Sequence, residues 1–144
     1  MIIRRYKESD WKQLRSMIME QWDEEYACEA VCYEYRDPWY YLDNFLSSED
    51  HIVFVAIKDN ELCGYIVLGY CPNSIELIYV YTSINKRRQG ISMALIRQAE
   101  IHGQVEKKEE IWMDSVVSND RSHKLKAKLG YVNEMTHYTS RKKL

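Results

Sequence analysis

Three consecutive apolar segments in the middle of the chain constrain its fold more than any other feature. They are HIVFVAI (51–57), ELCGYIVLGY (61–70) and SIELIYVYTS (74–83), and each is rich in the β-branched and aromatic residues that favour strands. The pair Asp59-Asn60 separates the first two segments, as a hairpin turn does. We therefore expect three successive strands, the first two joined as a hairpin.

The N-terminal third predicts one strand and two helices. Residues 2–6 alternate in polarity and predict a first strand. Ser9 or Asp10 can cap a following helix, and a short helix is expected over 37–46, because Asp and Pro at its start suit the N-cap and the first helical position. The apolar stripe of the first helix consists of Trp11, Leu14, Ile18 and Trp22.

The C-terminal half predicts two further helices and two further strands. They are a helix over 91–103, a strand over 110–117, a helix from a cap at Asn119 or Asp120 to Gly130, and a strand from Tyr131 to about Ser140. The order β-α-α-β-β-β-α-β-α-β predicts an α/β fold with a mixed sheet and at least one crossover unit. A length of 144 residues suits a single domain, 1–144.

Composition excludes several classes of function. The net charge of −2 gives no reason to expect a nucleic-acid partner, and no apolar run is long enough to span a membrane. Four cysteines, two of them at Cys28 and Cys32, lack the CxxC or histidine spacing of a metal site. We expect reduced thiols in a cytoplasmic protein that holds no metal.

A basic loop with one glycine precedes the helix expected at Ile91. Arg87, Arg88, Gln89 and Gly90 lie between a strand and a helix N-terminus, where free N–H groups and the helix dipole favour an anion. The loop matches neither a P-loop nor GxGxxG. On its own it fits a solvated turn as well as a phosphate cradle.

Two motifs in this order resemble the GNAT superfamily of N-acetyltransferases. Arg87-Arg88-Gln89-Gly90-Ile91-Ser92 is similar to its R/Q-x-x-G-x-G/A signature, with Ser92 at the second small position. Asn119, Ser122, Leu125, Gly130 and Tyr131 fit its N-x-x-A-x-x-L-Y-x-x-x-G-F pattern. The resemblance implies a central, mostly antiparallel mixed sheet flanked by helices, with a parallel pair of strands that splays apart at an acetyl-CoA site.

The resemblance also implies roles for cofactor-binding residues. The backbone N–H groups of 88–94 would hold the CoA pyrophosphate, and those of 79–82 would pair with the pantetheine arm. Asn119 would contact the pantetheine or thioester end, although alone it fits a helix N-cap equally well. The expected cofactor residues are Tyr79, Val80, Tyr81, Thr82, Arg87, Arg88, Gln89, Gly90, Ile91, Ser92, Met93, Ala94 and Asn119.

Acetyl transfer needs removal of the amine proton and stabilisation of the oxyanion. Glu76 matches the glutamate with which many GNAT enzymes bind or deprotonate the amine, although by pattern alone it also fits a structural edge position. The general-acid tyrosine of the superfamily is replaced here by Lys126, which leaves Tyr138, His123 or water to protonate the thiolate. The expected catalytic residues are Glu76, Asp114 and Tyr138.

A finer resemblance is to small aminoglycoside 6′-N-acetyltransferases. Four segments are similar to that family. They are the strand IELIYVY, the CoA helix in RRQGISMALIRQAE, the acidic loop at Asp114-Ser115 and the substrate loop around Trp22. Residues 81–86 are about two residues longer than in that family, and the loop at 71–74 is shorter. The resemblance implies acceptor contacts from Trp22, Tyr26, Glu76 and Asp114, attack on acetyl-CoA by the 6′-amine, and a homodimer.

The segment from Glu20 to Asp37 supports a cationic acceptor independently. It holds seven acidic residues against the single base Arg36, interleaved with aromatic rings. Such a segment suits a polycationic sugar, through ion pairing and ring stacking, but it equally suits a solvated acidic helix face. A peptide, a polyamine or another small amine fits the same charge, and a CoA-binding module without catalysis also remains open.

Overall fold

A computed structural model describes residues 1–27, 38–114, 119–133 and 139–144 of the chain. Within these residues seven strands form one mixed sheet in the order β1-β2-β3-β4-β5-β7-β6. The strands are β1 (Ile2–Arg5), β2 (His51–Lys58), β3 (Glu61–Tyr70), β4 (Ser74–Thr82), β5 (Glu110–Asp114), β6 (Val132–Asn133) and β7 (Thr139–Lys143). The helices are η1 (Glu8–Asp10), α1 (Trp11–Ala27), α2 (Pro38–Ser47), η2 (Ile84–Lys86), α3 (Ile91–Val105) and α4 (Asp120–Lys128).

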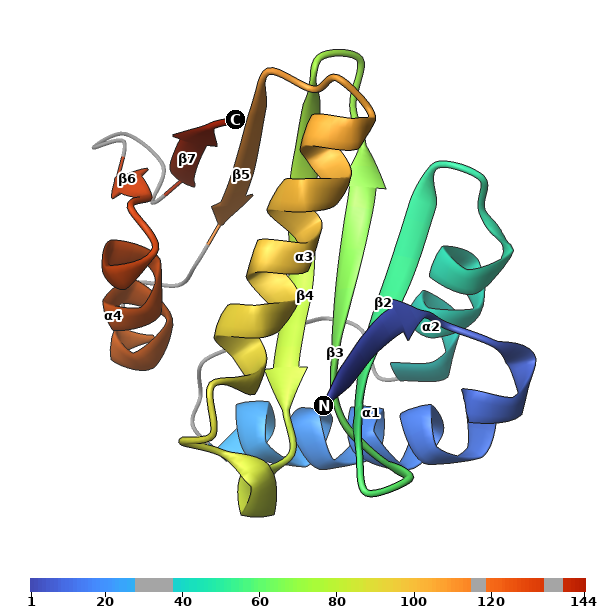
Figure 1. The fold of residues 1–144 in the computed structure, drawn as a ribbon. Helices are drawn as coiled ribbons and strands as arrows, with labels where there is room; N and C mark the ends of the chain where they lie inside the picture. The colour runs from blue at the N-terminus through green and yellow to red at the C-terminus, as the bar shows by residue number, and fades with distance from the viewer. Residues whose placement is uncertain (28–37, 115–118, 134–138) are drawn as a thin grey trace.

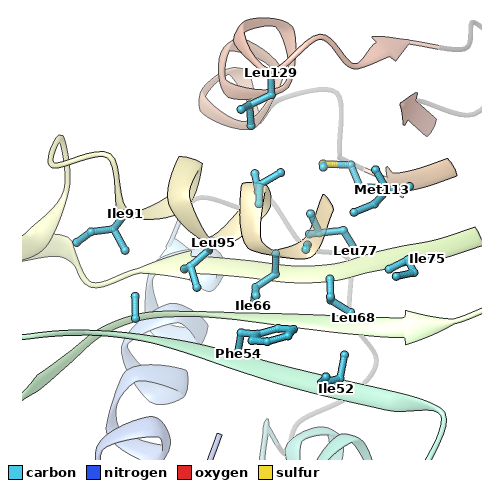
Figure 2. Close-up of a cluster of buried hydrophobic side chains, with 14 of the residues drawn as sticks. Ile52, Phe54, Ile66, Leu68, Ile75, Leu77, Ile91, Leu95, Met113 and Leu129 are labelled. Carbon is cyan, nitrogen blue, oxygen red and sulfur yellow. The ribbon is translucent and has the colours of Figure 1, made fainter. Parts of the chain in front are cut away.

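The central strands bury both faces, because successive side chains of a strand point to opposite sides. On β2, Ile52 and Phe54 pack in a core cluster with Leu95 of α3, whereas Val53 and Val55 pack in a second cluster with residues of α1 and α2. We call these two sides the α3 face and the α1 face. Figure 2 shows the cluster on the α3 face, and Figure 1 shows α3 running along the sheet.

The predicted hairpin between β2 and β3 is confirmed, and the two residues of its turn determine the backbone conformation of the turn. Asp59 and Asn60 both have positive φ, 54° and 61°. Two consecutive positive φ values are the requirement of a type I′ turn, which Asn and Asp tolerate better than most residues. The turn sets the pairs next to it, Lys58 with Glu61 and Ile57 with Leu62, and the register then shifts by one residue between Ile57 and Ala56.

A bulge in β4 bends the strand where it separates from β5. In the β3–β4 register Val67 lies opposite Tyr79 and Leu68 lies opposite Leu77, so Ile78 is the extra residue. The parallel pairing of β4 with β5 covers Ser74–Glu76 only, although β4 continues to Thr82. A bulge locally bends and twists its strand, and β4 therefore splays from β5 beyond Glu76.

The expected mixed sheet with one splayed parallel pair is confirmed, and one expected element is wrong. Residues 131–140 do not form one strand: β6 and β7 are separate strands that pair antiparallel with each other. Here β7 also takes the exposed edge of β5, pairing Asp114 with Thr139. Within the described residues, no helix is both long and apolar enough to span a membrane.

Candidate functional site

The basic loop ends at a helix N-terminus that no side chain caps. Gly90 is the N-cap residue of α3 and has φ 77°, and its carbonyl accepts the first helical bond from Ala94 at 3.0 Å. A Cβ at Gly90 would meet no atom within 4 Å, so the backbone conformation, and not lack of space, requires glycine there. The first N–H groups of α3 thus remain available to an anion.

A pocket of about 520 Å³ lies in front of this N-terminus and brings most of the expected cofactor residues together. Tyr79, Gln89 and Ala94 are the expected residues that do not line it, and Gln89 instead accepts a hydrogen bond from Lys58 at 2.8 Å. The lining residues are Glu24, Val80, Tyr81, Thr82, Arg87, Arg88, Gly90, Ile91, Ser92, Met93, Asn119, Asp120, Arg121, Ser122 and Leu125.

Asn119 closes the pocket from the side of α4 and is a helix N-cap. Its Oδ1 accepts a hydrogen bond from the Ser122 backbone N–H at 3.1 Å. Opposite it, the Ser92 and Thr82 hydroxyls lie 2.8 Å apart and join the start of α3 to the end of β4. Residues 81–86 form the end of β4 followed by η2.

Arg87 has a carboxylate partner that the sequence did not reveal. Its Nη1 donates to Glu24 Oε1 at 2.7 Å, and its Nη2 donates to the other oxygen of the same carboxylate. Arg121 of α4 donates to Glu24 at 2.8 Å, and the Tyr81 hydroxyl donates to it at 3.1 Å. The bonds from Arg87, above all, and from Arg121 and Tyr81 lower the pKa of Glu24 to about 2, against the opposing effect of burial.

Glu20, one helical turn before Glu24, extends this link from α1 to the loop. Its carboxylate accepts hydrogen bonds from the Ile84 backbone N–H at 2.6 Å and from the Ser83 hydroxyl at 2.9 Å. Part of the acidic run therefore holds the loop that follows β4. The helical spacing of Glu20 and Glu24 was visible in the sequence, but their partners lie 57 or more residues away along the chain.

Glu76 and Asp114 form an acidic pair where β4 and β5 separate. Ile75, Leu77 and Met113 belong to the cluster on the α3 face, so the intervening Glu76 and the last residue of β5 point toward the α1 face. Glu76 is partly buried over Gly69, whose added Cβ would lie 3.7 Å from its Oε2. Burial first, and the Asp114 charge second, raise the pKa of Glu76.

The structure describes the other expected site residues to different extents. Trp22 lies on α1 and is partly buried. Tyr26 belongs to the last turn of α1, but its side chain lies outside what the structure describes. Tyr138 also lies outside the described residues, as do Cys28 and Cys32.

A family model, the acetyltransferase (GNAT) family, matches residues 11–131. The chain belongs to this family. The match includes α1, β4, the basic loop, α3 and α4, which together supply the lining of the pocket. As a GNAT acetyltransferase the protein uses acetyl-CoA, which supplies an acetyl group activated as a thioester. No curated protein sequence matches this chain significantly.

Solved structures show that the fold is shared at low sequence identity. A PaiA N-acetyltransferase from Thermoplasma acidophilum, in complex with coenzyme A, has a TM-score of 0.78 at 20% identity and 100% coverage of both chains. A ribosomal-protein-alanine N-acetyltransferase from Brucella melitensis has 0.77 at 21%, again covering 100% of both chains. An aminoglycoside acetyltransferase from an uncultured soil metagenomic sample, in complex with sisomicin, has 0.73 at 19%, covering 94% of this chain and 92% of that one.

The residues of the pocket fit acetyl-CoA. Gly90 has the positive φ that lets the loop turn into α3, and the uncapped N–H groups after it suit a pyrophosphate. Beyond Glu76, β4 no longer pairs with β5, so its backbone N–H and C=O groups face the splay. These groups can form hydrogen bonds with an amide-containing arm. Arg88 also lines the pocket, whereas Arg87 is already paired with Glu24.

Proposed function

We propose that this protein acetylates a primary amine of a small polycationic acceptor, most specifically the 6′-amine of an aminoglycoside. The proposal rests on the pair of Glu76 and Asp114, which points to the α1 face at the inner end of the splay. The acidic helix α1 covers that same face. An ammonium group that enters between α1 and the splay therefore meets carboxylates before it meets the thioester.

The raised pKa of Glu76 suits it to accept the proton of the acceptor amine. A carboxylate with an ordinary pKa is a weak base at neutral pH, and burial strengthens it as a base. Once neutral, the amine attacks the thioester carbonyl directly in a ternary complex, so that a C–N bond forms and the C–S bond breaks. Asp114 keeps the site attractive to cations after Glu76 is protonated.

Among the structures with this fold, one is an aminoglycoside acetyltransferase bound to sisomicin and another is a ribosomal-protein-alanine N-acetyltransferase. Both lie near 20% identity, and either acceptor class is cationic. A peptide amine, a polyamine or another small amine is therefore the second candidate. The paired carboxyl groups of Glu76 and Asp114 favour the acceptor with the most positive charges.

The test is release of free CoA thiol from acetyl-CoA with a panel of aminoglycosides, polyamines and peptides at equal concentration. We expect the highest kcat/KM with aminoglycosides that carry a 6′-amine, and NMR of the product should show acetylation at that nitrogen. A matched aminoglycoside with a 6′-hydroxyl is the control and should react at least 100-fold more slowly. A higher kcat/KM with a peptide or polyamine would instead support the second candidate as the acceptor class. Tight CoA binding without turnover of any acceptor would indicate a binding module.

A further inference from the structure

Lys126 on α4 has an unusual environment among the side chains that the structure describes. It is only 2% exposed and ranks among the largest fully buried side chains. Its Nζ has no hydrogen-bond partner among the described residues. Lysine is almost never buried without a partner, and an unsatisfied buried polar group calls for an explanation such as a catalytic role.

The position of Lys126 places it beside the candidate site. On α4 it follows Leu125 directly and lies one turn after Ser122, and both of these residues line the pocket. Leu129, three residues later, packs in the same cluster as Met113 of β5 (Figure 2). Figure 1 shows α4 beside the sheet next to the end of β5. Lys126 thus neighbours two pocket-lining residues on α4, although its own buried side chain is not among the residues that line the pocket.

The charges around Lys126 come from both sides of this gap. Burial lowers the pKa of its ammonium group, and Asp114 at the end of β5 opposes that effect. The same Asp114 also acts on Glu76 across the splay. His123 lies three residues earlier on α4, and Asp114 is the carboxylate whose field reaches Lys126 among the described residues. Three ionisable groups on β4, β5 and α4 therefore surround the position where the two strands separate.

Acetyl transfer to any acceptor leaves an electron pair on the sulfur of CoA when the C–S bond breaks. We propose that Lys126 is the cation that stabilises this sulfur and donates a proton to it. The acceptor nitrogen gains the acetyl group and loses its proton to Glu76 or water. The proton of Nζ moves to the sulfur, giving the neutral thiol of CoA, and Lys126 takes up a proton from water when the product leaves.

This role follows from properties that lysine has and arginine lacks. An ammonium group in a dry site can give up its proton, whereas a guanidinium group stays charged at every physiological pH. The lack of a hydrogen-bond partner for Nζ in the described part of the chain is then functional, because such a bond would compete with the sulfur. The inference rests on acetyl transfer itself and not on the identity of the acceptor.

The test measures ionisation of the CoA thiol in the binary complex, without any acceptor. Ultraviolet absorbance of the thiolate is recorded against pH for bound CoA, with desulfo-CoA as the reference that lacks the thiol. In the wild type, the thiol of bound CoA should have a pKa at least one unit below that of free CoA. Lys126→Met should bring it back to the free value or above, and Lys126→Arg should keep it low while slowing turnover at least tenfold.

A second readout separates this role from a structural one. At a pH above the pKa of the free CoA thiol, the wild type should bind CoA at least tenfold more tightly than desulfo-CoA, because one unit of pKa corresponds to a factor of ten in affinity for the thiolate. Lys126→Met should bind both equally in calorimetry. Lys128→Met is the matched control on the exposed side of α4 and should behave as the wild type. An unshifted thiol pKa in the wild-type complex, or a shift that persists in Lys126→Met, would overturn the proposal. The wild-type measurement decides alone if the variant does not fold.

Discussion

At the scale of single residues, the acidic pair at the splay predicts how activity depends on pH. The Asp114 charge contributes to raising the pKa of Glu76. If ionised Glu76 is the base, kcat/KM rises as pH passes upward through that pKa. In Asp114→Asn the contribution of the Asp114 charge is lost, so the acid limb of the profile should move to lower pH. The acceptor KM should rise about tenfold, because one carboxylate is lost from a cation site.

The measurement is kcat/KM against pH with one good acceptor, with the KM for acetyl-CoA determined in parallel. The KM for acetyl-CoA should stay within about twofold, since Asp114 does not line the pocket. Asp50→Asn, an exposed change in the turn before β2, is the control and should leave the profile unchanged. An acid limb that stays in place or moves upward in Asp114→Asn would contradict the assignment of Glu76.

Residue by residue, the sequence predicted those parts of the site that depend on local pattern. Gly90, the helix after it and the N-cap at Asn119 are encoded within a few residues of themselves. Glu24 was missed as the partner of Arg87, because the two lie 63 positions apart and only the packing of α1 against the loop brings them together. The burial of Lys126 was missed for another reason. A lysine on an amphipathic helix is expected to be exposed, and only tertiary packing buries it here.

At the scale of elements, Glu24 ties together α1, the loop after β4 and α4. Its pKa is lowered to about 2, so the ionised form stabilises the fold. This contribution is fully present above pH 4.5, the ordinary value for the carboxyl group, and is lost as pH falls toward 2. Glu24→Gln should lower the free energy of unfolding by about 2 kcal/mol at pH 7, and by less than half as much at pH 3.

Urea unfolding of the wild type and Glu24→Gln at both pH values measures this difference directly. Asp23→Asn changes the neighbouring exposed carboxylate and should cost less than about 0.5 kcal/mol at either pH. A loss of stability that is equal at pH 7 and pH 3 would mean that packing of the side chain, and not its charge, accounts for the effect.

Element types followed from the sequence more readily than the pairing of strands. The β2–β3 hairpin was predictable because its turn lies between its strands. The end of the chain was not, since β7 pairs with β5 across α4 and the two-residue β6 has too few positions to show an alternation. The bulge at Ile78 was equally invisible, although it separates β4 from β5 and so opens the cofactor edge.

At the scale of the whole molecule, the pocket draws residues from α1, β4, the basic loop, α3 and α4. Unfolding destroys such a site, so acetyl-CoA should stabilise the entire fold by mass action. At a concentration 100-fold above its Kd the gain is about 2.7 kcal/mol. For a chain of this length, that raises Tm by about 8 °C. Adenosine 3′,5′-bisphosphate, which lacks both the pantetheine arm and the phosphate attached to it, should give a smaller shift at the same concentration.

Two glycines provide a matched test of where this stabilisation originates. Gly90 and Gly130 have φ values of 77° and 81°, and an added Cβ would meet no atom within 4 Å at either. Alanine at either position should therefore lower the stability of the free protein by the same amount, about 1 kcal/mol, through backbone strain alone. Only Gly90 precedes the N–H groups at the start of α3. The Tm shift at a fixed acetyl-CoA concentration should shrink in Gly90→Ala and stay at the wild-type value in Gly130→Ala. Equal ligand-induced shifts in the two variants would mean that the conformation of Gly90 does not support cofactor binding.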